Sequence, residues 1–322
     1  MIIVTGGAGF IGSCIVSRLN ELGHRDIIIV DHWDEQGLKK KNLVGKSFQK
    51  FFDKTDFLSL VLADKIEGEI SCIIHMGACS STTGQDWEYY LRNNFEYSCH
   101  MAQFALKKKA RFIYASSAAT YGDGENGYSD DQSAILSCKP LNFYGTSKQM
   151  FDEWILQEDL YAQVVGLKFF NVFGPNEYHK GEMRSVIAKA YGRVVGEGRM
   201  SLFKSHREGF GDGEQKRDFI YVKDAVDIVR FFMEHSQING IFNVGTGQAR
   251  SWNDLAHALF DAAGKKLQIE YVDMPEQLRS RYQYFTQADM ANLRRVGYER
   301  SFTSLELAIS DYVRYLKDEA FL

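Results

Sequence analysis

Three side chains in the middle of the chain have the types and spacing needed to move a proton. Tyr144 and Lys148 lie four residues apart in a segment predicted to be helical, so they occupy one face of that helix. A tyrosine with an ordinary pKa near ~10 is a weak base at neutral pH, and we expect Lys148 to favour its phenolate. Ser117 ends a predicted strand, where its hydroxyl can orient a substrate hydroxyl. A Tyr/Lys pair on an ordinary surface has no such role, so the interpretation depends on the surrounding elements.

The first thirteen residues supply a place for a nucleotide. Residues 1–5 (M-I-I-V-T) predict a buried strand, and residues 6–12 (G-G-A-G-F-I-G) follow at once. This order of strand, glycine turn and helix start is typical of a dinucleotide-binding βαβ unit. Gly6 lets the chain leave the strand, Gly9 permits close approach of a pyrophosphate, and Gly12 permits close packing of the helix. A nicotinamide held there takes a hydride while a nearby base takes the proton of the same hydroxyl.

The residues leave the choice between NAD and NADP open. Asp31 closes a strand predicted over residues 26–30, where an acid usually accepts hydrogen bonds from the adenosine ribose and favours NAD. The lysine run 39–41 and Lys54 supply cations that would neutralise a 2′-phosphate on the same ribose and favour NADP. A solvated basic loop explains these lysines equally well.

Alternating strands and helices predict the fold that brings these groups together. The expected strands are 26–30, 71–76, 112–115 and 164–169, with a further strand and turn within 240–247, and the expected helices are 10–22, 86–109, 140–160 and 184–195. This alternation predicts an α/β fold with a doubly wound parallel Rossmann sheet, whose ligands bind at the carboxyl ends of its strands. Asn93 and Asn94 lower the helix propensity of residues 86–109, and we expect one of them to bind a loop or the cofactor. Residues 123–139 predict a polar loop, and residues 171–175 a turn that stops regular structure.

The expected domains follow from these elements. Residues 1–169, with about 218–247, form the NADP-binding Rossmann domain, and residues 170–217 and 248–322 form a smaller α/β substrate-binding domain. Because the chain has only three prolines and no Pro-rich linker, we expect the two domains to dock closely.

Composition excludes several classes of protein. The chain has 322 residues, of which 45% are hydrophobic and 25% charged, as in an ordinary soluble protein. A net charge of −4 gives no general reason to bind nucleic acid or a membrane surface. Five widely spaced cysteines without a C-x-x-C pair indicate reduced thiols rather than disulfides or a metal site. No apolar run approaches a membrane span and the fold begins at residue 1, so we expect a cytoplasmic protein.

Four motifs carry a resemblance to a known superfamily. They are T-G-G-A-G-F-I-G at 5–12, Y-A-S-S-A-A-T-Y-G at 114–122, Y-G-T-S-K at 144–148 and F-F-N-V-F-G-P at 169–175. They resemble the extended short-chain dehydrogenase/reductase superfamily, which includes nucleotide-sugar epimerases, dehydratases and reductases. Dehydratases of this superfamily place an Asp-Glu pair directly after the Ser/Thr. Ala118 and Ala119 stand there in this chain and cannot transfer protons, so dehydration is disfavoured.

Three further motifs narrow the resemblance. They are G-A-C-S-S-T-T at 77–83, E-Y-H-K-G at 177–181 and R-Y-Q-Y-F-T-Q-A-D at 281–289. They are similar to the ADP-L-glycero-D-manno-heptose 6-epimerase family of lipopolysaccharide core synthesis. The resemblance implies ADP-heptose as substrate, bound NADP, a homo-oligomer (a pentamer) and a second acid/base lysine at Lys180. Composition alone would favour an exposed loop lysine there.

The resemblance also implies a use for two proton-transferring groups. Inversion at C6 of the heptose by oxidation and reduction needs proton transfer at two places, which a single tyrosine serves poorly. Tyr144 and Lys180, on two sides of the substrate, would serve both.

Together the motifs and the resemblance define the expected binding residues. The expected cofactor-binding residues are Gly6, Gly9, Phe10, Ile11, Gly12, Asp31, His32, Lys39, Lys54, Met76, Gly77, Ala78, Cys79, Ser80, Asn93, Lys148 and His179. The expected substrate-binding residues are Ser117, Asn171, Glu182, Lys189, Phe203, Lys204, Ser205, His206, Arg217 and Tyr282. Arg217 resembles a diphosphate clamp, because a guanidinium fork suits two phosphate oxygens, and a salt bridge to Asp218 or Asp224 is the alternative. Tyr282 either stacks at the substrate end or is a core tyrosine.

Two other functions remain open. A UDP-sugar 4-epimerase would use Ser117, Tyr144 and Lys148 without needing Lys180. A non-catalytic NADP-binding scaffold on the same fold would have no use for a tuned tyrosine.

Overall fold

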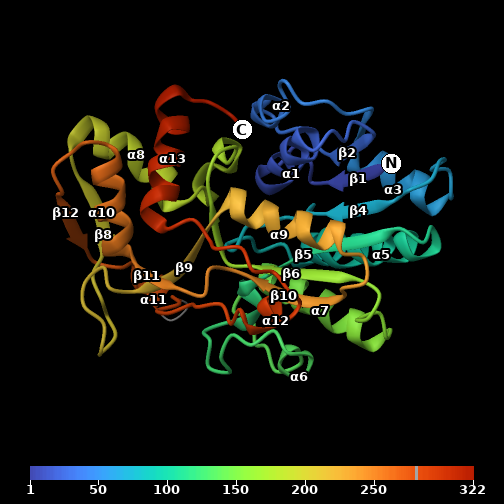
Figure 1. The fold of residues 1–322 in the computed structure, drawn as a ribbon. Coiled ribbons are helices and arrows are strands. Elements are labelled where there is room, and N and C mark those ends of the chain that lie inside the picture. Colours follow the sequence, from blue (N-terminus) through green and yellow to red (C-terminus); the bar gives the residue numbers. More distant parts are fainter. Residues whose placement is uncertain (280–281) are drawn as a thin grey trace.

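A parallel sheet forms the centre of the computed structural model, which describes residues 1–279 and 282–322. Its seven strands run in the order β10-β6-β5-β4-β1-β2-β3 (Figure 1). They are β1 (Ile2–Thr5), β2 (Ile27–Asp31), β3 (Lys50–Asp53), β4 (Cys72–His75), β5 (Arg111–Ser117), β6 (Val165–Phe169) and β10 (Gly240–Val244). The order of the strands reverses between β1 and β4, and ligands of such sheets bind at this switch point. The predicted doubly wound α/β fold is confirmed.

Helices cover both faces of this sheet. They are α1 (Phe10–Glu21), α3 (Lys54–Leu62), α5 (Tyr97–Lys107), α7 (Phe143–Gln157) and α9 (Val222–Glu234). In β1, Ile2 and Val4 join a buried hydrophobic cluster with α1 and α9, whereas Ile3 joins a second cluster with α3, α5 and α7. Successive residues of a strand point to opposite faces, so the apolar run of β1 fills two cores at once.

Smaller elements form a second layer beside the carboxyl ends of the main sheet. A three-stranded sheet contains β11 (Ala249–Ser251), β9 (Lys216–Tyr221) and β7 (Asn171–Phe173), and a two-stranded sheet contains β12 (Ile269–Val272) and β8 (Met200–Phe203). Helices α8 (Val186–Glu197), α10 (Trp252–Ala262) and α13 (Leu305–Asp318) pack on one another there (Figure 1). The short helices are α2 (Leu38–Lys41), α4 (Trp87–Tyr90), α6 (Gln132–Ile135), α11 (Glu276–Arg279), α12 (Ala291–Arg295) and the 3₁₀ segments η2 (Ala118–Tyr121) and η3 (Tyr178–Met183).

The helix expected over residues 86–109 is present over residues 87–107, with a π-helical segment, η1 (Leu91–Glu96), between α4 and α5. Two other expectations about local structure were wrong. Residues 171–173 form β7 rather than a turn, since they pair with β9. The polar loop 123–139 contains α6. Within residues 218–247, β9 lies in the three-stranded sheet, whereas α9 and β10 belong to the main sheet and its cover.

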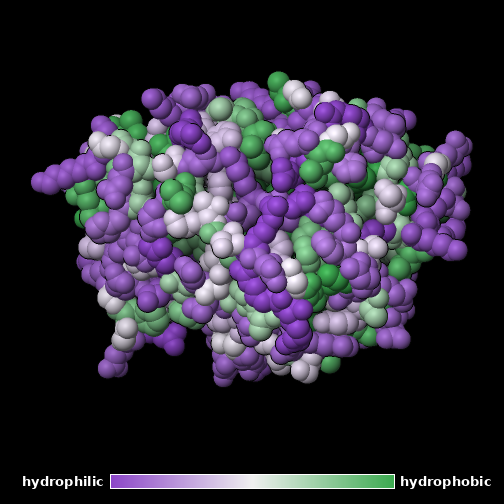
Figure 2. Space-filling model, in the orientation of Figure 1, coloured by the Kyte–Doolittle hydropathy of each residue, from purple (hydrophilic) through white to green (hydrophobic). Residues whose placement is uncertain are grey.

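Hydrophilic residues cover most of the drawn surface of the molecule (Figure 2). The hydrophobic residues of the face in Figure 2 lie in small separate groups. Within residues 1–279 and 282–322, no helix has the length and apolar character needed to cross a membrane.

Candidate active site

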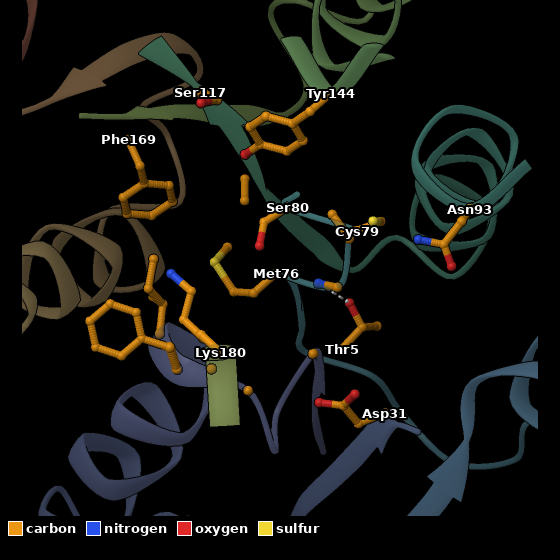
Figure 3. Close-up of a pocket in the computed structure, with 18 of the residues that line it drawn as sticks. Thr5, Asp31, Met76, Cys79, Ser80, Asn93, Ser117, Tyr144, Phe169 and Lys180 are labelled. Carbon is orange, nitrogen blue, oxygen red and sulfur yellow. Dashed lines mark hydrogen bonds between the residues drawn. The ribbon is translucent and has the colours of Figure 1, made fainter. Parts of the chain in front are cut away.

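A cavity of about 490 Å³ lies at the carboxyl ends of β1, β4 and β5. Every residue expected to bind the cofactor lines it, and so do the four residues expected to act in catalysis, Ser117, Tyr144, Lys148 and Lys180. Figure 3 shows ten of the lining residues converging from several elements. Sequence analysis missed Thr5, Val30, Tyr89, Tyr97, Ala115, Ser116, Phe169, Phe170, Val172 and Met183, which also line it. Most of these lie at or just after the end of a central strand, and this position in the sequence could have identified them as lining residues.

The glycine turn is shaped for a group that approaches the backbone. Gly6 has a φ of +65°, and a Cβ there would lie 2.7 Å from the Gly77 nitrogen. A Cβ on Gly12 would overlap the Gly6 carbonyl oxygen. Helix α1 begins after Gly9 with no side-chain cap and no acid in its first turn, so its free N–H groups and its positive dipole end remain available to an anion. This turn fits the diphosphate of a dinucleotide.

At the far end of the cavity, Asp31 is already engaged by the protein. Its Oδ2 accepts a hydrogen bond from the Ala8 nitrogen at 3.0 Å, and its Oδ1 accepts one from the His32 nitrogen at 2.8 Å. The Lys39 ammonium lies 2.8 Å from the same Oδ1. Lys54, which lines the same cavity, donates to Asn93 Oδ1 at 2.5 Å. One cation is therefore paired with the buried Asp31 carboxylate, and a second cation lines the same cavity.

Asn94 joins the loop after β4 to helix α7. Its side-chain oxygen accepts from the Cys79 nitrogen at 2.8 Å, and its nitrogen donates to the Cys79 carbonyl oxygen at 3.0 Å. The same nitrogen donates to Ser147 Oγ at 3.0 Å, and Ser147 donates to the Tyr144 carbonyl oxygen at 2.8 Å. The expectation that one asparagine of this helix binds a loop is confirmed for Asn94. Residues 77–80 and the helix of Tyr144 are thus held in register.

A buried histidine that sequence analysis missed supports the same loop. His75 Nδ1 lies 2.6 Å from Thr5 Oγ1, and its Nε2 lies 2.9 Å from Ser98 Oγ. Burial lowers the pKa of His75 to about 3, so the ring is neutral and bridges β1 to α5. The Gly77 nitrogen donates to Thr5 Oγ1 at 3.2 Å, which extends the chain of hydrogen bonds to the cavity. Its partners are distant in sequence, so the sequence pattern gave no signal for this role.

The Ser117–Tyr144–Lys148 group is assembled, but its electrostatics differ from the expectation. Burial raises the pKa of Tyr144, and a hydrogen bond with Ser117 opposes that rise. The Lys148 ammonium donates to the Ala115 carbonyl oxygen at 2.8 Å, and burial lowers its pKa to about 8. The expected lowering of the Tyr144 pKa by Lys148 is therefore wrong for this structure, because desolvation of the phenol dominates.

Lys180 faces the cavity from η3. Its ammonium lies 5.2 Å from the centre of the Phe10 ring, and burial lowers its pKa. Figure 3 shows the side chains of Tyr144 and Lys180 pointing into the cavity from opposite sides, with Met76 and Phe169 along its walls. Lys180 is thus not the exposed loop lysine that composition favours. The chain presents the Tyr144 hydroxyl and the Lys180 ammonium to one cavity.

Arg217 lies in a second cluster, outside this cavity. Only 6% of Arg217 is exposed, and its guanidinium lies 5.1 Å from the Tyr282 ring and 5.8 Å from the Trp252 ring. Among the described residues no carboxylate pairs with Arg217. Asp218 accepts from the backbone of residues 246, 247 and 288, and Asp224 accepts from residue 303. The alternative of a salt bridge to Asp218 or Asp224 is therefore wrong.

Residues 203–206 surround the same aromatic cluster. Phe203 lies 6.2 Å from Tyr282, and Tyr282 accepts a hydrogen bond from the Trp252 indole at 2.9 Å. The His206 nitrogen donates to the Tyr284 hydroxyl at 3.0 Å. Lys204 pairs with Asp273 at 3.4 Å, and Ser205 donates its hydroxyl proton to the Arg207 carbonyl oxygen. A buried cation among aromatic rings is suited to a nucleotide diphosphate with its base.

Three residues expected to contact the substrate lie on the surface and outside the cavity. Asn171, Glu182 and Lys189 are exposed, and none of them is among the described residues that line the cavity. The Lys189 ammonium donates to the Glu182 carbonyl oxygen at 3.1 Å. Met183, the next residue after Glu182, lines the cavity instead.

The sequence and the fold of this chain are similar to those of several known proteins. Residues 2–245 match the model of the NAD dependent epimerase/dehydratase family. The ADP-L-glycero-D-manno-heptose-6-epimerase of Nitratidesulfovibrio vulgaris is 50% identical, over 98% of this chain and 97% of that protein. The protein of the same name from Fusobacterium nucleatum is 46% identical over the whole of both chains. The crystal structure of ADP-L-glycero-D-manno-heptose-6-epimerase from Helicobacter pylori is similar with a TM-score of 0.83 at 28% identity, covering 98% of this chain and 96% of that one.

Proposed function

Since this chain belongs to the NAD dependent epimerase/dehydratase family, we propose that it inverts C6 of ADP-D-glycero-β-D-manno-heptose to give the L-glycero epimer, a step in lipopolysaccharide core precursor synthesis. Its relatives at 46% and 50% identity over nearly the full length make it an enzyme of the epimerase class, an isomerase. The observation that carries the proposal is the approach of Tyr144 and Lys180 to one cavity from opposite sides.

A bound nicotinamide cofactor supplies transient hydride acceptance and return at C6. Tyr144 exchanges the proton of the C6 hydroxyl on one face, and Ser117 orients that hydroxyl by hydrogen bonding. Lys148 holds the ribose hydroxyls next to the nicotinamide. Because C6 lies outside the sugar ring, rotation about the exocyclic bond turns its other face to the cofactor. Lys180 then exchanges the proton at the new position of the oxygen. One of the two groups takes a proton in the oxidation and the other gives one in the reduction, and proton exchange with solvent restores both before the next turnover.

Two cations support NADP as the cofactor. Asp31 already accepts two backbone hydrogen bonds and pairs with Lys39, so its capacity to accept from a ribose 2′-hydroxyl is reduced. Lys39 and Lys54 line the same cavity and offer positive charge to a 2′-phosphate. The family is described as NAD dependent, which supports a nicotinamide cofactor without distinguishing NADP from NAD.

The second cluster supports an ADP-sugar as the substrate. The Arg217 guanidinium, buried and without a carboxylate partner in the described part of the chain, is suited to the diphosphate. Tyr128 connects this cluster to the cavity, since its ring lies 6.2 Å from the ring of Phe170, a lining residue. The nucleotide would occupy the cluster while the heptose reaches Tyr144.

Three finer expectations belong to this proposal. We propose the division into a Rossmann domain (1–169 with about 218–247) and a substrate domain (170–217 and 248–322). The place of β10 in the main sheet supports it, whereas β9 pairs with β7 and β11 of the smaller sheet, so the second boundary would fall after β9. A homopentamer rests on the resemblance to the family, and a cytoplasmic location rests on the five widely spaced cysteines, which indicate reduced thiols. Sedimentation of the purified protein and fractionation of cells that express it test the last two.

The deciding experiment uses two active-site variants and a surface control. The purified protein is incubated with ADP-D-glycero-β-D-manno-heptose and the epimers are followed by NMR. Tyr144→Phe and Lys180→Met should each lower kcat by about 10²- to 10⁴-fold, the usual contribution of a general acid or base. Lys265→Met, an exposed lysine beyond α10, should leave the rate unchanged.

The same variants separate the competing functions. A UDP-sugar 4-epimerase would convert UDP-galactose, leave the heptose unchanged and keep nearly full activity in Lys180→Met. A non-catalytic scaffold would bind NADP and turn over neither substrate. Conversion of the heptose that is lost in both variants excludes these two alternatives.

A further inference from the structure

A fully buried ion pair lies behind the active site, against helix α7. The Lys168 ammonium is 2.7 Å from Asp152 Oδ2, and both side chains are 0% exposed. Asp152 also accepts hydrogen bonds from the Tyr114 hydroxyl at 2.9 Å and from Ser116 Oγ at 2.6 Å. Lys168 donates a second hydrogen bond to Thr120 Oγ1 at 2.8 Å. Neither charge reaches solvent, and neither Asp152 nor Lys168 lines the cavity.

The members of this cluster are chain neighbours of the residues that form the active site. Asp152 stands one helical turn after Lys148 on α7. Ser116 directly precedes Ser117 at the end of β5, and Lys168 directly precedes Phe169 at the end of β6. The ion pair therefore joins β5, β6 and α7 directly behind residues that line the cavity, and Ser116, one of its hydrogen-bond partners, lines the cavity itself.

Stability alone does not explain a charge pair at this place. Two apolar side chains of similar volume are often as stable as a buried ion pair, because both ions must be desolvated. The charges do act on the active site. Asp152 opposes the lowering of the Lys148 pKa by burial, and it contributes to the raised pKa of Tyr144. Lys168, whose ammonium lies 2.7 Å from Asp152 Oδ2, carries the opposite charge.

We propose that Asp152 and Lys168 are positioning residues of the active site, which align Ser117 with α7 and set the electrostatic balance under which Tyr144 and Lys148 exchange protons. The inference rests on the proposed function, since it assigns a task to residues that act through Tyr144 and Lys148. Asp152 and Lys168 carry opposite charges, so their effects on the Tyr144 hydroxyl and the Lys148 ammonium have opposite signs. Removing Asp152 and removing Lys168 must therefore have opposite consequences.

Other titratable groups packed around these residues must be considered in any pH profile. Within the described residues they are His75 on β4, Cys79 in the following loop, Tyr114 on β5, Tyr121 on η2 and Cys138 in the loop before α7. Burial keeps His75 neutral, and burial raises the pKa values of Tyr114, Tyr121 and Cys138, so these four stay uncharged near neutral pH. Cys79 is common to all variants below and is checked by Cys79→Ser. The ion pair supplies the charges that the substitutions change.

The test uses the holoenzyme and four variants. Asp152→Asn leaves Lys168 as an unopposed cation, and Lys168→Met leaves Asp152 as an unopposed anion. The double variant removes both charges, and Lys168→Arg keeps the charge. Asp311→Asn is the matched control, because Asp311 forms a partly buried ion pair with Lys223 at 2.7 Å, outside the active site.

Two readouts are measured as a function of pH. The first is kcat/KM for ADP-heptose. The second is the ultraviolet difference absorbance of tyrosinate, with the Tyr144→Phe protein as the reference, which reports the ionisation of Tyr144 and needs no substrate. If the wild-type protein does not convert the heptose, the proposed function fails while the second readout still decides this inference.

The expected result is a pair of opposite shifts. Asp152→Asn should move the acidic limb and the Tyr144 titration to lower pH by roughly one unit, and Lys168→Met should move both to higher pH by a similar amount. The double variant and Lys168→Arg should return close to the wild-type profile, and Asp311→Asn should not move it. Shifts of one sign in both single variants, or no shifts alongside lowered melting temperatures, would overturn the proposal. Should a single variant not fold, a double variant whose titration remains displaced by a full unit would also overturn it.

Discussion

Replacing Asn94 with alanine should both destabilise the protein and loosen its cofactor site. The side chain is 0% exposed and makes four hydrogen bonds, two with the Cys79 backbone, one to Ser147 and one from Asn93. Leaving such buried groups without partners costs about 1–3 kcal/mol each, and partial relaxation reduces the sum, so we expect a loss of about 3 kcal/mol. Because residues 77–80 line the cavity, cofactor affinity should fall by roughly tenfold.

The adjacent asparagine provides a matched control. Asn93 is only partly buried, and it donates to Asn94 and accepts from Lys54. Solvent can satisfy Lys54 after Asn93→Ala, so we expect a loss of about 1 kcal/mol or less. The two variants are compared by thermal unfolding of the protein without cofactor. Cofactor titration compares Asn94→Ala with the wild type alone, because Asn93 itself lines the cavity.

The comparison has a clear contrary outcome. If Asn94→Ala lowers the unfolding temperature no more than Asn93→Ala, and binds cofactor as tightly as the wild type, the loop after β4 is held by something other than Asn94. The account of how β4 and α7 stay in register would then be refuted.

Three further substitutions test other parts of the site. The pKa of His75 is about 3 in the folded protein and about 6.5 in the unfolded chain. Below pH 6.5 the unfolded state therefore binds more protons, so the free energy of unfolding falls as the pH is lowered, by about 1.4 kcal/mol per pH unit. His75→Gln should therefore flatten the dependence of unfolding free energy on pH between about 6 and 4, and an unchanged slope would contradict the neutral buried ring. Lys39→Met should weaken NADP at least tenfold in a calorimetric titration and leave NAD little changed, because Asp31 becomes free to accept from a ribose; equal losses for both cofactors would argue against a 2′-phosphate contact. Arg217→Met should raise KM for the ADP-sugar by roughly 10- to 100-fold with the cofactor content unchanged, and a normal KM would remove the guanidinium from the diphosphate site.

The sequence correctly predicted the parts of the site that depend on residues close together in the chain. The turn around Gly6, Gly9 and Gly12 and the four-residue spacing of Tyr144 and Lys148 each specify a short backbone geometry, and the structure has both. The parallel, doubly wound sheet follows from the same local alternation, because a helix between parallel strands allows few connections. The cavity at the switch point is a consequence of that topology.

The features that sequence did not predict depend on partners distant in the chain. His75 acquires its role from Thr5 and Ser98, and the π-helical segment arises where Asn94 meets Cys79. The raised pKa of Tyr144 depends on how deeply the phenol is buried, and no spacing pattern reports burial. The exposed position of Glu182 likewise depends on how η3 turns, so motif position alone misplaced that contact.

The most direct test of the central claim is epimerisation in deuterated water. Transient oxidation with hydride return keeps the original hydrogen on C6, since the hydride never exchanges with solvent. Incubation of the purified protein with ADP-D-glycero-β-D-manno-heptose in D₂O should give the L-glycero epimer without deuterium at C6, with NADP released when the protein is denatured. An epimer that carries deuterium at C6, or a heptose that stays unchanged, would contradict the account.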